Sequence, residues 1–320
     1  MLGRVVGKRL LQSIPVLGGV TLITFMILNV LPGNAALAIL GQQATAQSQA
    51  ALEKQLGLNQ PLVERYFTWL GHVLQGHLGN SLITQQSVLT ELTQRAPVTV
   101  ELLVLGIIFA LVTAIPIAVL AAGRPGGIVD RLSAVVAMAA LSIPTLILGI
   151  VFILLLAVKF KIFPATGFTP LSSGLGPNLK TMFLPALTIS GVLFATYTRL
   201  LRADMAEQIA TEDYVTVARS KGISKAVILT RHVLRNSLFG LITVVGVNFG
   251  TLLGGTVIVE SVFSLPGMGQ LLVLSINSRD ANSVQGIVLL LAAAVVLVNL
   301  LTDVLYALLD PRVHYGRPAH

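Results

Sequence analysis

Apolar residues recur in runs of about 20 or more along this 320-residue chain. A helix needs roughly 20 apolar residues to cross a hydrocarbon core of about 30 Å, because each residue advances it by about 1.5 Å. Only 11% of the residues are charged, against roughly 25% in soluble proteins. A chain so poor in charge cannot cover a water-facing surface, so the sequence predicts an all-α polytopic membrane protein.

The apolar runs predict six transmembrane helices. They cover residues 10–31, 98–122, 133–158, 182–201, 238–261 and 285–309. The first run follows Arg4, Lys8 and Arg9 and precedes Ala36-Leu-Ala38, a pattern that also occurs in cleaved signal peptides. Its apolar run is longer than the roughly 7–15 residues of a signal sequence, which favours an uncleaved anchor.

The distribution of basic residues predicts the orientation of the chain. With the N-terminus inside, 14 of the 21 Lys and Arg residues fall in inner segments and 7 in outer ones. Basic residues concentrate on the cytoplasmic side of membrane proteins, so both termini are expected to be cytoplasmic. The same loops account for the net charge of +8, without any need for a nucleic-acid partner.

Several chemistries are disfavoured by what the sequence lacks. It contains no cysteine, which excludes disulfides, thiolate metal sites and a cysteine nucleophile. His72 and His77 are five residues apart, a spacing that does not place them on one helix face, so we interpret them as ordinary polar residues and expect no metal site. Glu101, Glu260 and Asp303 fall near the ends of their spans, and no span carries a central proton relay.

Enzyme motifs are also missing from the sequence. There is no H-E-x-x-H, G-x-S-x-G or G-x-x-x-x-G-K-[ST] pattern. We therefore expect no catalytic residue and no cofactor in this chain, and any ATP that drives it must be hydrolysed by another subunit.

Three connections are longer than tight turns. They are an outer segment over about 34–96, with a helical stretch from Gln47 to Gln75; an inner loop over 202–237; and an outer loop over about 262–284. In the last of these the Pro266-Gly267 pair predicts a turn. The length and helical pattern of the outer 34–96 segment suit a docking surface or a cap, and packing on the spans is the alternative. The expected organisation is residues 1–96, then a transmembrane domain over 97–310, then a tail over 311–320.

The inner loop predicts two short helices around a glycine. Before Gly222, the residues Tyr214, Val217 and Ala218 share one helix face, at spacings of three and four. After it, an apolar stripe alternates with polar residues; the stripe is Ile228, Leu229 and Val233, and the polar residues are Arg231, His232 and Arg235. Such a helix–turn–helix projection suits insertion into a groove on a partner.

A basic loop resting on anionic lipid headgroups is the alternative interpretation of 202–237. Acidic residues interspersed in the loop disfavour it, since a lipid-binding patch is less mixed in charge. These are Asp204, Glu207, Glu212 and Asp213.

The loop sequence resembles the "EAA" coupling loop of bacterial ABC-importer permeases. The resemblance is carried by Asp213-Tyr-Val-Thr-Val-Ala-Arg-Ser-Lys-Gly222 and Arg231-His-Val-Leu-Arg-Asn236. Further motifs, in order along the chain, are similar to the first permease subunit of dipeptide and oligopeptide importers. They are Leu56–Tyr66, Gly76–Ser81, Pro97–Glu101, Val262–Gly269 and Asp310–Arg312.

The chain departs from the family pattern at its acidic position. The pattern is Glu-Ala-Ala, three residues, then Gly, and the matching positions here are Thr216, Val217, Ala218 and Gly222. Only the last Ala and the Gly agree, so the resemblance implies a conserved shape at the turn and no acidic contact at Thr216.

The resemblance implies a type I importer permease in the bacterial inner membrane. Its implied partners are a second homologous permease subunit, two ABC ATPase subunits that bind ATP and Mg, and an extracytoplasmic peptide-binding protein. The implied coupling residues are Asp213, Tyr214, Ala218, Lys221, Gly222, Arg231 and Arg235, and the outer-loop motif is Pro266, Gly267 and Gly269.

Other functions stay open from the sequence alone. A permease for nickel or another small solute shares these motifs, and peptide contacts leave no short motif. A stand-alone secondary transporter or channel is disfavoured by the loop and by the absence of central charges. A membrane enzyme lacks a catalytic constellation.

Overall fold

The computed structural model describes residues 2–30, 40, 44–55, 57 and 59–309. The Ala36-Leu-Ala38 pattern, the Asp310-Pro-Arg312 motif and the 311–320 tail therefore lie outside the described residues. Within them the chain is helical, apart from one isolated antiparallel bridge between Asn80 and Ser87. The prediction of an all-α membrane protein is confirmed at this level.

Five helices are long and apolar enough to cross a membrane, and the number is six if a bent helix pair counts as one span. The described long helices include α1 (Leu2–Val30), α5 (Val88–Gly123), α8 (Leu175–Thr211), α11 (Leu234–Phe263) and α13 (Ala281–Leu309). The bent pair is α6 (Ile128–Ser142) with α7 (Thr145–Phe152) and its π-helical continuation η2 (Ile153–Lys159).

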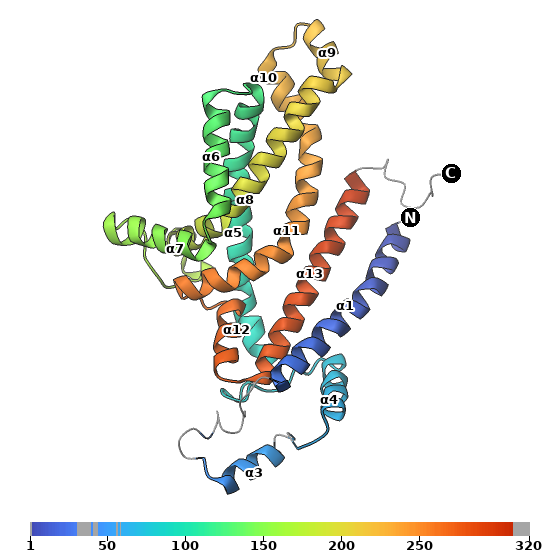
Figure 1. Cartoon of the computed structure of the whole chain (residues 1–320), viewed down its shortest axis with the longest axis vertical. Helices are drawn as coiled ribbons and strands as arrows, with labels where there is room; N and C mark the ends of the chain where they lie inside the picture. The colour runs from blue at the N-terminus through green and yellow to red at the C-terminus, as the bar shows by residue number, and fades with distance from the viewer. Residues whose placement is uncertain (1, 31–39, 41–43, 56, 58, 310–320) are drawn as a thin grey trace. The chain divides into compact units, whose positions relative to one another are not determined.

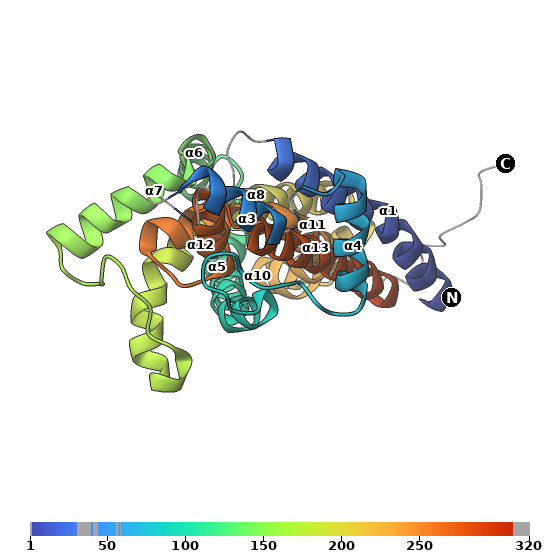
Figure 2. The same cartoon turned by 90° about the horizontal axis from the view of Figure 1, so that it is seen from below.

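The predicted span over 133–158 is not one continuous helix. It bends by 108° between α6 and α7, and Figure 2 shows α7 leading away from α6. Proline lacks an amide hydrogen and disfavours the helical conformation in the residue before it. Ile143 accordingly adopts an extended conformation (φ −90°, ψ 123°), and Pro144 stands before the first turn of α7.

The outer helical stretch predicted over Gln47–Gln75 is also interrupted. It forms α3 (Ala46–Gln55) and α4 (Leu62–Leu74). Gly57 takes a positive φ of 67° and Pro61 precedes α4, and both features end a helix. Within the same compact unit, Tyr66 on α4 reaches α1: its hydroxyl lies 3.0 Å from Thr21 Oγ1, and its ring meets the Phe25 ring edge-on at 5.4 Å.

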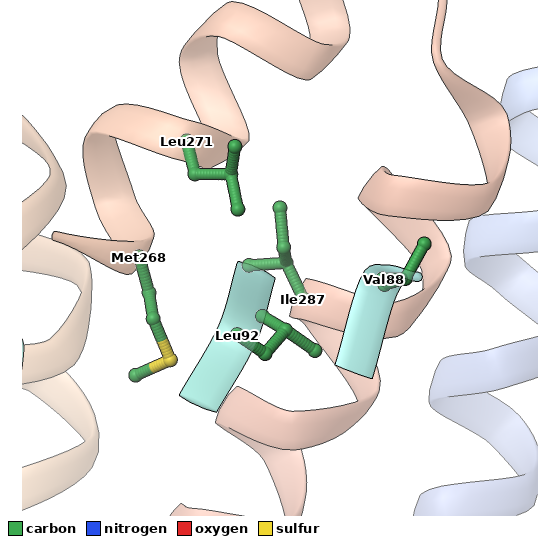
Figure 3. Packing of buried hydrophobic residues seen from close by; sticks show 5 residues of the cluster. All are labelled: Val88, Leu92, Met268, Leu271 and Ile287. Atoms are coloured by element: carbon green, nitrogen blue, oxygen red, sulfur yellow. The ribbon is translucent and has the colours of Figure 1, made fainter. Parts of the chain in front are cut away.

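The chain forms two compact units. One consists of residues 3–99 with 266–297, and the other of 100–265 with the part from 298 onward. In the first unit, apolar side chains from α5, α12 (Met268–Asn277) and α13 form a buried cluster (Figure 3). Its members are Val88, Leu92, Met268, Leu271 and Ile287. Gly286 lets α13 approach this cluster, because a Cβ there would lie 2.6 Å from Val88 Cγ1.

In the second unit, α8 packs against α6, α7 and α11. Small residues allow close helix contact, as is usual in membrane proteins. A Cβ on Gly149 of α7 would lie 3.3 Å from both Phe263 and Thr188, and one on Gly191 of α8 would lie 2.8 Å from Leu148. α9 (Asp213–Ser220) and α10 (Lys225–Val227) lie where α8 ends and α11 begins (Figure 1).

Candidate functional site

The end of α8 leads directly into the segment that resembles a coupling loop. α8 continues ten residues beyond Leu201, the end predicted for its span, and stops at Thr211. Glu212 takes an extended conformation (φ −83°, ψ 127°), and α9 begins at Asp213. One residue therefore separates the two helices, so their relative direction depends on few backbone angles and on the contacts between them.

Gly222 closes α9 with a Schellman turn. The Gly222 amide donates to the Arg219 carbonyl at 3.0 Å, and the Ile223 amide donates to the Ala218 carbonyl at 3.2 Å. This pair of bonds places the residue after the C-cap in the left-handed region, where glycine is favoured. Gly222 has φ +73°. The turn between the two arms therefore has a definite shape.

The second arm of the projection contains the predicted apolar stripe. After α10, residues Ile228–Val233 form a π-helical turn (η4) that runs into α11. Ile228, Leu229 and Val233 are all buried, as their spacing predicted. The predicted helix–turn–helix is thus confirmed, with a π-helical segment that the sequence did not reveal.

Of the three residues that share one face of α9 by their spacing, only Ala218 is buried. Val215 and Ala218 are buried, whereas Val217 is 50% exposed and Tyr214 is half-buried. α9 packs on η4, and a helix of eight residues has room for only a narrow buried stripe. Ala218 therefore contributes to packing within this chain.

The remaining residues that the resemblance implies for coupling are exposed. They are Asp213, Lys221, Gly222, Arg231 and Arg235. Three of the five are basic and one is acidic.

Two side-chain pairs of this region were not anticipated from the sequence. Gln208 and Ser237 lie 29 residues apart, and the Gln208 Nε2 donates to Ser237 Oγ at 2.9 Å. At the start of α6, Asp130 accepts two bonds of 2.9 Å each from the Arg202 guanidinium on α8. No spacing rule reveals such pairs, because both depend on how distant helices pack.

The outer-loop motif has a structural place in the first unit. Gly267 precedes α12 in an extended conformation, and Gly269 is buried in its first turn. The Met268 amide donates to Thr99 Oγ1 at 2.9 Å. The connection bends at Gly267, but its turn residue is Ser264, which takes a left-handed conformation with φ 53°. The Met268–Thr99 bond joins two motifs that are separate in the sequence, Pro97–Glu101 and Val262–Gly269.

Asp280 links the Gly76–Ser81 motif to α13. Its carboxylate is buried and accepts bonds from the Ser81 hydroxyl, the Leu82 amide, and the amide and hydroxyl of Ser283. Asp280 stands immediately before α13, so its bond to the Ser283 amide is an N-cap. An acidic residue ahead of an apolar run is the signal that could have predicted this cap.

A polar cavity of ≈ 800 Å³ lies in the first unit, lined among others by Arg65, His72 and His77. The Arg65 guanidinium donates to Asn29 Oδ1 at 2.9 Å and lies 5.8 Å from the centre of the Phe25 ring. Burial lowers the pKa of Arg65 from its ordinary value. In the described part of the chain, no three His, Asp or Glu side chains are grouped to hold a metal ion.

These features define the class of protein: an all-helical membrane protein with a shaped projection between two of its long helices. The chain matches the family of binding-protein-dependent transport system inner membrane components over residues 114–315, and the N-terminal component of that family over 1–103. The chain belongs to this family and is a multi-pass protein of the bacterial inner membrane.

Curated relatives match over almost the whole chain. It is 36% identical to a probable peptide ABC transporter permease of Sinorhizobium fredii and 33% identical to a dipeptide transport system permease of Alkalihalophilus pseudofirmus. It is 34% identical to a glutathione transport system permease of Escherichia coli. Each match covers 96% of this chain and 98% of the relative.

Proposed function

We propose that this chain is a permease subunit of an ATP-driven importer for di- and oligopeptides. Two family models account for residues 1–103 and 114–315, and relatives named for peptide, dipeptide and glutathione transport are 33–36% identical to it over nearly its full length. In this proposal the chain forms half of the translocation path and a second, homologous permease subunit forms the other half. An extracytoplasmic binding protein delivers the peptide.

The proposed catalytic work is done by partner subunits. Two ABC ATPase subunits bind ATP and Mg, and this chain hydrolyses nothing. With the six spans of a type I importer permease, both termini and the 202–237 projection lie in the cytoplasm. The excess of Lys and Arg in these segments supports this orientation.

The observation that carries the coupling proposal is the exposed tip around Gly222. Val217 and Val227 are 50% and 41% exposed on the two arms, and the Schellman turn fixes the backbone between them. Isolated apolar side chains at the end of a water-facing projection suit the groove of a partner protein. In this arrangement the buried Ala218 packs α9 onto η4, and the exposed tip enters the ATPase.

Substitution of Gly222 by arginine tests the proposal. Gly222→Arg places a long cation at the tip, and we expect uptake of radiolabelled dialanine to fall to background in cells. The permease should remain in the membrane, whereas ATPase subunits should no longer copurify with it. Uptake at the normal rate, with normal permease abundance, would refute the coupling role.

Gly126→Arg is the matched control. Gly126 has φ +75°, close to that of Gly222, and at both positions a Cβ would meet nothing within 4 Å. A side chain in the left-handed region costs about 1–2 kcal/mol at either position. Backbone strain is therefore the same in the two variants, and a loss of uptake confined to Gly222→Arg assigns the effect to the tip.

A further inference from the structure

Gln208 makes three hydrogen bonds that join three helices of the second unit. Its Nε2 donates to Asp204 Oδ2 at 2.8 Å within α8 and to Ser237 Oγ at 2.9 Å on α11. Its Oε1 accepts from the Tyr214 hydroxyl on α9 at 2.7 Å. One side chain thus bonds to the projecting helix and to two of the long helices.

The chemistry of the partners fixes the orientation of this amide. A carboxylate only accepts hydrogen bonds, so the Asp204 oxygen must face the NH₂ group of Gln208. The carbonyl oxygen then faces Tyr214, whose hydroxyl donates. Ser237 is 3% exposed, and a bond sheltered from water is electrostatically stronger than one in solvent. Rotating the amide would turn its oxygen toward the Asp204 carboxylate and break that bond.

The hydrogen bond from Tyr214 to Gln208 lies on a side of α9 that is only partly buried. Val215 and Ala218 pack the other side of the helix. Next to the Gln208–Tyr214 bond lies a cleft of ≈ 380 Å³, lined by Asp204, Glu207, Gln208, Thr211, Glu212, Tyr214 and Asn236. Glu212 alone separates α8 from α9. The hydrogen bond between Gln208 and Tyr214 therefore restrains the angle between the two helices.

We propose that Gln208 is a positioning residue for energy coupling: it holds α9 against both α8 and α11. A displacement of α9 by an ATPase then moves two long helices together. The inference rests on the proposed function, because it assumes that α9 receives the ATPase. Gln208 itself contacts neither nucleotide nor peptide in this scheme.

The test uses Tyr214→Phe, Gln208→Leu and the double variant in the complete transporter, reconstituted in liposomes. The readout is the amount of dialanine transported per ATP hydrolysed. A lost hydrogen bond shifts an equilibrium by about two- to tenfold, and we expect each single variant to lower the transport ratio within this range. The double variant should lower the transport ratio no further than Gln208→Leu alone does, because both changes remove the bond between Gln208 and Tyr214.

A distance measurement reports the position of α9 directly. The chain has no cysteine, so spin labels can be placed at Ala203→Cys on α8 and Ser220→Cys on α9, both exposed. Tyr214→Phe should broaden the distance distribution. Thr243→Ala is the control, because the Thr243 hydroxyl bonds only to the Phe239 carbonyl of its own helix, and it should change neither readout.

The outcomes separate the two proposals. A normal transport ratio and an unchanged distance distribution in both Tyr214→Phe and Gln208→Leu would overturn the role of Gln208, while copurification of the ATPase subunits would leave the proposed function in place. Failure of the ATPase subunits to copurify with the unsubstituted chain would overturn the proposed function, and the coupling role of Gln208 with it. Tyr214→Phe removes one oxygen atom, so loss of folding does not obscure the result.

Discussion

Asp280 joins the segment around Ser81 to the start of α13 in the first unit. Its buried carboxylate accepts four hydrogen bonds, from Ser81, Leu82 and Ser283. Asp280→Ala leaves these donors without their acceptor and also removes the N-cap of α13. We expect a loss on the order of 2–4 kcal/mol in the free energy of unfolding, since unsatisfied buried donors and a lost cap each cost about 1–2 kcal/mol. Thermal unfolding in detergent measures it.

Asn282→Ala provides the comparison for Asp280. The Asn282 side chain makes one exposed bond, from Nδ2 to the Asn80 carbonyl at 2.8 Å. Its removal should shift the unfolding midpoint much less than Asp280→Ala does. Equal shifts in the two variants would contradict the central role of the carboxylate.

Individual residues could be predicted from the sequence where their role depends on near neighbours in the chain. Gly222 could be predicted because a turn glycine between two amphipathic stretches shows in the sequence alone. Gln208 could not, since its partners Ser237 and Tyr214 become neighbours only after α8, α9 and α11 pack. The buried side of α9 could not be predicted for the same reason: spacing defines a face, and tertiary packing decides which face is covered.

At the scale of helices, close contact between α11 and α13 depends on Gly246. A Cβ there would lie 2.0 Å from Thr302 Oγ1, a distance that no side chain tolerates. We expect Gly246→Ala to destabilise the protein by about 1–3 kcal/mol, as overpacking usually does. Gly254→Ala, in the same helix and with nothing within 4 Å, should instead be neutral or stabilise by about 0.5–1 kcal/mol.

A second substitution establishes whether the clash with Thr302 is the cause. Thr302→Gly removes the side chain that a Cβ on Gly246 would meet, so it should restore the unfolding midpoint of Gly246→Ala toward that of Thr302→Gly alone. Equal destabilisation by Gly246→Ala with and without Thr302 would show that the loss comes from elsewhere.

Helix positions followed from the sequence better than helix ends did. Five of the six apolar runs contain one long helix, because membrane thickness fixes the minimum length, and the sixth contains the bent pair α6–α7. The extension of α8 to Thr211 was missed, since polar residues beyond a span carry no apolar pattern. The break at Ile143–Pro144 was not predicted, because the apolar run over 133–158 continues across it and predicts one helix.

At the scale of the whole molecule, sequence and structure answer different questions. The count of Lys and Arg residues predicts which loops are cytoplasmic, and the fold supplies the helices that cross between them. The family match joins the two, since it accounts for both the N-terminal part and the transmembrane part of the chain. A path that accepts peptides with many different side chains needs no fixed motif, so no short sequence pattern marks the residues that contact them.

The bent pair α6–α7 decides the number of spans, and single cysteines test it. If the pair crosses the membrane once, its two ends lie on opposite sides, and the distribution of basic residues predicts that α6 begins on the cytoplasmic side. Arg124 and Ser172 flank the pair and both are exposed. In a chain without native cysteine, we expect an impermeant maleimide to label Ser172→Cys in intact spheroplasts, and Arg124→Cys only after permeabilisation.

Protection of both positions in intact spheroplasts would make the pair a re-entrant loop and reduce the spans to five. The 202–237 projection would then lie outside the cell, where no ATPase can reach it, so this labelling pattern tests the coupling proposal as well as the topology.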